Sequence, residues 1–314
     1  MSVRPWSLWW TCSIFMTEDG DVQFWCAASS DPWSWTPKPY VGVWLAMAAL
    51  VVFYMRAWRR HRPDRPLSRL ERRKPWWFGL GVALLWVATD WPVGALGAGY
   101  LASLHMLQFM IYTLGVGPLL LLGIPDWFLD HARQQRWWQV VRTLSRPLVA
   151  GLLFNAVLLS THAPVTVDLL RATQIGSFVM DVVWFAAGLI VWLPVLNPDS
   201  TLRHRSPAVR AVYLFLAVGA LPMLPGGFLV FASGPLYRTF ELAPPVFDIS
   251  ATVDQQLAGL IMKVGNLPIV WPVLLVLFVK WSRADQAVAP PPPRPAVDVL
   301  AGTAPSAGAE SADS

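Results

Sequence analysis

The amino-acid sequence predicts an all-α integral membrane protein: a bundle of seven transmembrane helices with its N-terminus outside the cell and its C-terminus in the cytoplasm. The first observation is composition, because 55% of the 314 residues are hydrophobic and only 14% are charged, whereas soluble domains have about 25% charged residues. The second is the presence of 19 tryptophans, a residue type that gathers at membrane–water interfaces. The third is the alternation of long apolar stretches with loops rich in Lys and Arg.

Each expected span is close to the length of about 20 apolar residues that crosses roughly 30 Å of hydrocarbon. The spans are residues 40–57, 76–91, 100–123, 147–162, 175–196, 209–232 and 256–281. The loop after the first span holds the densest basic cluster: Arg56, Arg59, Arg60, Arg62, Arg65, Arg69, Arg72, Arg73 and Lys74. Further basic segments follow the third, fifth and seventh spans. Because short basic loops stay in the cytoplasm, these clusters predict the orientation.

The chain is expected to have three parts. Residues 1–38 are Trp-rich and mildly acidic, and we expect an extracytoplasmic tail at the interface, with a cleaved signal peptide as the alternative. Residues 39–283 form the seven-helix membrane domain. Residues 284–314 are rich in Pro and Ala, which predicts a disordered cytoplasmic tail.

The third span organises the predicted site, because it carries His105 near its start. An ionisable side chain within a span marks by default a site facing the bundle interior or an aqueous cavity. A histidine that only hydrogen-bonds a neighbouring helix is the alternative. The other polar residues of the spans fall toward the same outer end: Asp90, His162, Asp181, Asp254, Gln255 and Lys263. This asymmetry predicts a site open to the extracytoplasmic side.

Two methionines extend this histidine into a candidate soft-metal patch. Met106 and Met110 are four residues apart, so they share a helix face. Imidazole and thioether groups are suitable ligands for Cu(I), which makes His105, Met106 and Met110 candidate copper contacts, with His162 as a further candidate. Packing of the methionines in the core is the alternative.

Two opposite charges have similar expected depths in the membrane. Asp181 lies in the fifth span and Lys263 in the seventh. Each would be costly alone and less so when paired, so we predict a direct ion pair, with separate hydrogen bonding of each residue as the alternative.

Several function classes lack a signature. The cysteines are Cys12 and Cys26 only, so a disulfide framework and a CxxC metal motif are excluded, and whether the two thiols pair stays open. The chain has no HExxH motif, no phosphate-cradling Gly loop and no convincing Ser–His–Asp set, so we expect no enzyme. Its basic clusters favour contact with the lipid bilayer over nucleic acid.

Several motifs together resemble the CtaG family of membrane cytochrome c oxidase assembly factors, over about residues 33–283. They are His105-Met106, Gly117-Pro118 continuing to Pro125, His162-Ala163-Pro164, Gly188 to Trp192-Leu193-Pro194, Pro235-Leu236-Tyr237, and the stretch from Asp254, Gln255 and Gln256 through Gly259 to Met262. The resemblance implies a non-enzymatic factor of the bacterial cytoplasmic membrane. It also implies oxidase subunits as partners and copper handling at the outer face.

The sequence departs from the family pattern at several positions. Phe109 stands where the family has a second histidine, Ser177 and Asp181 stand where a histidine pair is expected, and Lys263 stands where Trp is usual. The predicted Asp181–Lys263 pair is then interpreted as a replacement that holds the helices together. Two alternatives stay open: a transporter for copper or another small solute, and a metal-free scaffold that binds a partner membrane protein.

Overall fold

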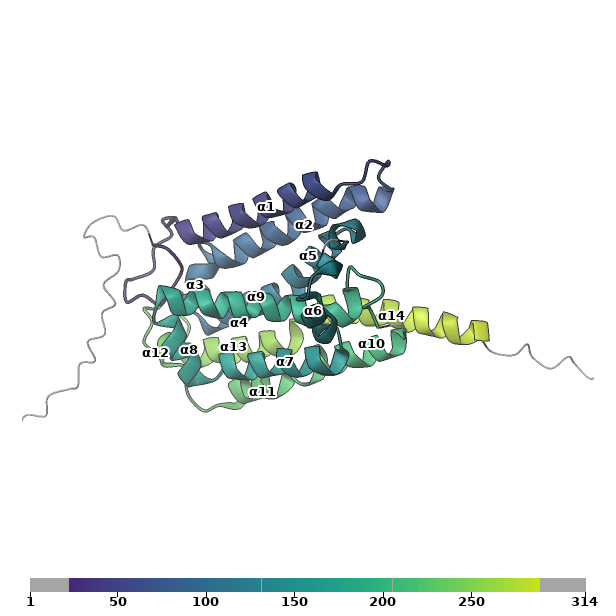
Figure 1. Cartoon of the computed structure of the whole chain (residues 1–314). Helices are drawn as coiled ribbons and strands as arrows, with labels where there is room; N and C mark the ends of the chain where they lie inside the picture. Colours follow the sequence, from purple (N-terminus) through teal and green to yellow (C-terminus); the bar gives the residue numbers. More distant parts are fainter. Residues whose placement is uncertain (1–22, 131, 205, 289–314) are drawn as a thin grey trace, which may run out of the picture.

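The computed structural model describes residues 23–130, 132–204 and 206–288, and these residues form a helical bundle (Figure 1). The long helices run alternately in opposite directions along one axis, so that α8, α12 and residues 23–40 lie at one end of the bundle. The loop between α1 and α2, with α6 and the end of α14, lies at the other. The predicted all-α class is confirmed, and within the described residues the β-type pairing is an isolated bridge between Gln23 and Tyr40.

The elements follow one another in this order: α1 (Val41–His61), α2 (Arg69–Thr89), α3 (Val93–Gly99), α4 (Ala102–Met110), η1 (Ile111–Val116), α5 (Gly117–Gly123), η2 (Asp126–Leu129), η3 (Ala132–Gln134), α6 (Trp138–Leu144), α7 (Pro147–Thr161), α8 (Pro164–Arg171), α9 (Gln174–Leu196), α10 (Pro207–Leu214), η4 (Phe215–Ala220), α11 (Met223–Phe231), α12 (Arg238–Glu241), α13 (Ala251–Val264) and α14 (Leu267–Val288).

Five helical stretches of the described chain are long and apolar enough to cross a membrane. The number rises to seven if each of two bent pairs is one span: α2 with α3, bent by 47°, and α6 with α7, bent by 84°. The predicted seven spans are therefore the upper value that the helices allow, and the orientation of the termini stays a prediction.

Two spans contain a π-helical segment just before a proline. Pro118 follows η1, and since proline has no N–H, the hydrogen bond that residue 118 would donate to the Leu114 carbonyl cannot form. Pro222 follows η4 and likewise leaves the Val218 carbonyl without its helical donor. The side chain of Asn266 donates to that carbonyl at 3.2 Å. Pro118, a residue of the family motif, thus shapes the span that carries the site.

Close backbone contacts hold the central helices together. A Cβ atom at Gly117 would lie 2.4 Å from the carbonyl oxygen of Gly188, so α5 and α9 pack with glycine against glycine. A Cβ at Gly259 would lie 2.7 Å from the carbonyl oxygen of Gly226, which brings α13 equally close to α11. The motif residue Gly259 is therefore a packing residue.

The described part of the predicted N-terminal tail packs against the helices. Residues 23–40, the N-terminal strap, pack onto the bundle with Trp25 and Cys26 buried. The backbone N–H groups of Phe24 and Trp25 donate to Gln174 Oε1 at 2.8 and 3.2 Å. The buried Trp25 indole finds its polar partner inside the protein, and the interfacial location of the tail stays a prediction. Residues 1–22, including Cys12, lie outside the described residues.

The last helix extends beyond the predicted start of the C-terminal tail. α14 continues past Ala284 to Val288, and the Pro-rich residues beyond it lie outside the described part of the chain.

The buried thiol of Cys26 gives a first prediction. It is a free thiol that donates to the Thr89 carbonyl, with Sγ and O 3.2 Å apart, and burial raises its pKa well above the ordinary value. Because the thiolate is the reactive form, Cys26 in a Cys12→Ser background should resist maleimide at neutral pH for hours and react fully after denaturation in SDS. Rapid labelling of the native protein would contradict its burial against Thr89.

Candidate functional site

Two histidines from different helices meet in the buried interior. His105 lies in the first turns of α4, and His162 follows the last residue of α7. Both side chains are buried, and their ring centroids lie 5.9 Å apart with the planes inclined by 64°. Two residues chosen from separate spans of the sequence therefore lie in one site.

Both imidazoles are held in the same way. His105 Nδ1 lies 3.1 Å from the carbonyl oxygen of Gly97, and His162 Nδ1 lies 2.8 Å from that of Leu158. A carbonyl oxygen only accepts, so each Nδ1 carries the hydrogen, and in the neutral ring Nε2 keeps its lone pair. Both Nε2 atoms are buried and have no hydrogen-bond partner within the described structure. This is the arrangement in which backbone carbonyls orient histidines as metal ligands.

The helix that carries His105 is capped by another helix. Asp254, at the start of α13, accepts hydrogen bonds from Ala102 N at 2.5 Å and Ser103 N at 3.2 Å, and also from the Ser103 hydroxyl. A carboxylate at a helix N-terminus satisfies free N–H groups and suits the helix dipole. Asp254 therefore fixes the turn that presents His105.

His162 is fixed by aromatic residues. The hydroxyl of Tyr237 donates to the His162 carbonyl at 2.9 Å. The Trp184 ring stacks on the imidazole, with centroids 5.5 Å apart and an angle of 20°, and its Nε1 donates to Thr161 Oγ1 at 2.9 Å. The motif residue Tyr237 thus positions a histidine rather than facing the membrane.

The other motif residues of α13 have structural environments. Gln255 Oε1 accepts from Leu236 N at 2.6 Å, and its Nε2 donates to the Gly234 carbonyl at 3.2 Å, which anchors the loop before α12. Met262 is buried in the core, whereas Gln256 is exposed.

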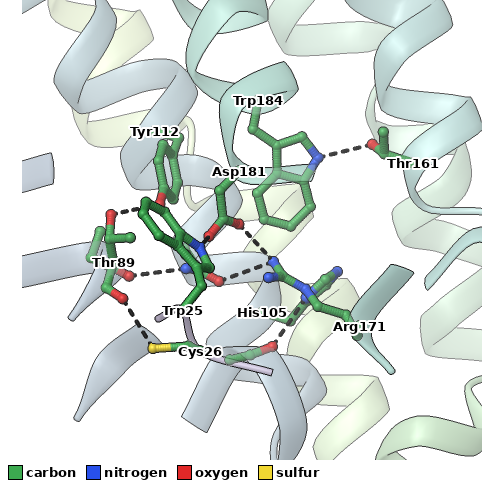
Figure 2. A network of polar contacts seen from close by, with 12 residues as sticks. Trp25, Cys26, Thr89, His105, Tyr112, Thr161, Arg171, Asp181 and Trp184 are labelled. Carbon is green, nitrogen blue, oxygen red and sulfur yellow. Dashed lines mark hydrogen bonds and ion pairs between the residues drawn. The ribbon is translucent and has the colours of Figure 1, made fainter. Parts of the chain in front are cut away.

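An ion pair lies beside the histidines, and it is not the predicted one. Figure 2 shows Asp181 of α9 facing Arg171, the last residue of α8. Asp181 Oδ1 and Arg171 Nη2 are 3.1 Å apart, and both side chains are almost fully buried. Lys263 instead lies over the ring of Phe231, 5.7 Å from its centroid. The predicted Asp181–Lys263 pair is therefore wrong, because a short helix folds Arg171 into the bundle at the depth of Asp181.

This pair joins the N-terminal strap to three helices (Figure 2). Trp25 Nε1 donates to Asp181 Oδ2 at 2.8 Å. Arg171 Nη2 also donates to Gln108 Oε1 at 3.3 Å, and the Gln108 amide donates to the Ala88 carbonyl at 3.0 Å. The Arg171 guanidinium lies over Trp184, 5.0 Å from its ring centroid. Trp184 therefore stands between the ion pair and His162.

The methionines have packing roles in the structure. Met106 is fully buried in the main core, and the methyl carbon of Met110 would lie 3.2 Å from a Cβ at Gly265, between α13 and α14. Their role as metal contacts stays a prediction. Phe109, at a departure from the family pattern, lies against His162 with ring centroids 4.6 Å apart.

A cavity lies near the histidine pair at the end of the bundle. A cavity of about 200 Å³ is lined by residues of α12 and the loop after it, together with Tyr100 and Asp254. Phe240 lines this cavity and also contacts the His105 ring, with centroids 5.4 Å apart. Phe240 thus separates the cavity from the buried imidazoles.

The donor set of the site is small. Within residues 23–130, 132–204 and 206–288, no group of three or more His, Cys, Asp or Glu side chains could hold a metal ion. Sequence reasoning missed Arg171 and Trp25 as parts of the site. Arg171 could have been noticed because it is a lone basic residue in a predicted outer loop that also contains an acidic residue. Trp25 could not, because it is one of many tryptophans.

The fold and the site define a helical protein with several helices long and apolar enough to cross a membrane and with a buried polar centre near one end of its bundle. The family model of cytochrome c oxidase caa3 assembly factors (Caa3_CtaG) matches residues 52–284, and the chain belongs to that family. No curated protein and no solved structure matches the chain.

Proposed function

We propose that this chain assists copper delivery to a cytochrome c oxidase at the outer face of the bacterial cytoplasmic membrane. One observation carries the proposal: two buried imidazoles, each anchored through Nδ1 to a carbonyl, hold unpartnered Nε2 atoms in one site. Assembly of the oxidase is the family's role; copper as the cargo and the outer face as the location are our inference.

The residues present fit a copper(I) ion in transit. Imidazole nitrogen suits copper, and a two-histidine donor set adds no charge. The neighbouring Arg171–Asp181 pair is internally neutral, so the positive charge of Arg171 is balanced before a cation enters. A site with few ligands suits a cargo that must leave for a partner, whereas a permanent metal centre would need a fuller shell.

The chain's own groups have distinct roles in this proposal. His105 and His162 bind through Nε2, Gly97 and Leu158 hold the rings in the required tautomer, and Trp184 with Phe240 keeps water away. A bound copper(I) ion would supply the Lewis acid that the two Nε2 lone pairs coordinate.

A deletion strain tests the proposal. Membranes lacking this protein should have at least tenfold lower oxidase activity at low copper, and added copper or the wild-type gene should restore most of it. Loss that copper does not relieve would favour a metal-free scaffold for the partner oxidase. Unchanged oxidase activity and haem spectra would contradict a role in assembly for this chain.

A further inference from the structure

A second cavity lies at the opposite end of the bundle from the histidines. It has a volume of about 670 Å³ and is formed where α2 begins and where α5 and α9 end. Its lining contains Arg65, Arg73, Lys74 and Arg203 against Glu71 and Asp126. Four cations and two anions leave the lining with a charge of +2.

Two of these cations are already used by the protein. Arg65 forms a double hydrogen bond with Glu71, at 2.7 and 3.0 Å, and Lys74 Nζ donates to the Ile124 carbonyl at 2.9 Å. Within the described residues, the side chains of Arg73 and Arg203 make no hydrogen bond and no ion pair. Two free guanidinium groups and an ammonium with further donor capacity thus face one hollow.

The rim of this cavity is apolar. Leu70, Trp77 and Leu122 line it and are exposed by 75%, 42% and 39%. Trp is the residue typical of the membrane interface, and exposed leucines beside it offer a surface for acyl chains. The cavity therefore combines a cationic floor with a hydrophobic edge. This combination is complementary to an amphiphile with a negatively charged headgroup.

We propose that this cavity binds the phosphate-bearing headgroup of an anionic phospholipid, with its acyl chains along Leu70, Trp77 and Leu122. Guanidinium groups recognise phosphate oxygens by paired hydrogen bonds, and basic pockets between spans are typical sites of anionic lipids. A free phosphate shares the head chemistry but would leave the apolar rim unused. This site is independent of the histidine pair and of the copper proposal.

The test uses the full-length chain, purified in detergent and stripped of lipid, with lipid retention measured by native mass spectrometry and thermal stability measured in parallel. Cardiolipin and phosphatidylglycerol should bind and raise Tm, whereas phosphatidylcholine and inorganic phosphate should not. The Arg73→Gln/Arg203→Gln variant should lose affinity by roughly 30-fold, since each basic group near a lipid surface contributes about 1 kcal/mol.

The matched control is Arg59→Gln/Arg60→Gln, which removes the same charge from exposed positions at the end of α1 that do not line the cavity. It should bind anionic lipid as the wild type does. Equal loss in both double variants would overturn the proposal in favour of diffuse surface attraction, and an equal Tm rise with inorganic phosphate would overturn the lipid assignment. If the cavity variant does not fold, Arg203→Gln alone should still weaken binding about fivefold.

Discussion

Replacing Asp181 with leucine is expected to destabilise the folded protein by about 3–5 kcal/mol, because it leaves the buried Arg171 charge without its carboxylate. The change also removes the acceptor for Trp25 Nε1, so the N-terminal strap should loosen. Arg171→Met should have a comparable effect, since it leaves the carboxylate with the indole as its main remaining donor. The measurement is the folded fraction in detergent after heating, read by size-exclusion chromatography.

The double variant Asp181→Leu/Arg171→Met separates the pair from its surroundings. With both charges gone, most of the lost stability should return, because neither group is left buried and unpaired. Lys263→Met is the matched control, and it should change stability by less than about 1 kcal/mol, the scale of its contact with Phe231. Additive losses in the double variant would show that Arg171 and Asp181 are not energetically coupled.

Substitution of either histidine by asparagine is expected to reduce oxidase activity to the level of the deletion strain while the protein still accumulates. Asparagine branches as histidine does, so its amide N–H can take the place of Nδ1 and donate to the carbonyl of Gly97 or Leu158. It has no counterpart of Nε2. The variants thus keep the anchoring hydrogen bond and lose the proposed ligand atom, and activity in a complemented strain is the measurement.

Met110→Leu is the matched control in the same helix. The structure places Met110 against Gly265, so a volume-conserving change should leave oxidase activity near the wild-type level. If the asparagine variants were active, the histidines would be interpreted as structural donors only. If Met110→Leu were as inactive as they are, the thioether would have to be included in the site.

Much of the architecture could be predicted from hydrophobic periodicity and charge placement. Long apolar stretches indicated the helices. The histidines could be selected because an ionisable group within an apolar stretch is rare. The close approach of His105 to His162 depends on which helices pack together. The position of a residue along its span does not reveal this.

The partner of Asp181 in the ion pair could not be predicted from the sequence alone. The estimated depths along the spans paired Asp181 with Lys263. In the structure, α8 instead places Arg171 inside the bundle, where its guanidinium pairs with the Asp181 carboxylate. The packing of the N-terminal strap was not predicted for a similar reason. The burial of Trp25 depends on contacts with Asp181 and Gln174, which are far away in the sequence. Tertiary partners decide polar contacts that local pattern leaves open.

Copper(I) titration of the purified full-length protein tests the central claim most directly. The experiment is an anaerobic competition with a coloured copper(I) chelator, on the wild type, His105→Asn, His162→Asn and Met110→Leu in a Cys12→Ser/Cys26→Ser background. We expect one copper(I) per chain for the wild type and Met110→Leu, and loss of that ion in both asparagine variants. Equal copper(I) uptake by all four proteins, or none by the wild type, would contradict that claim.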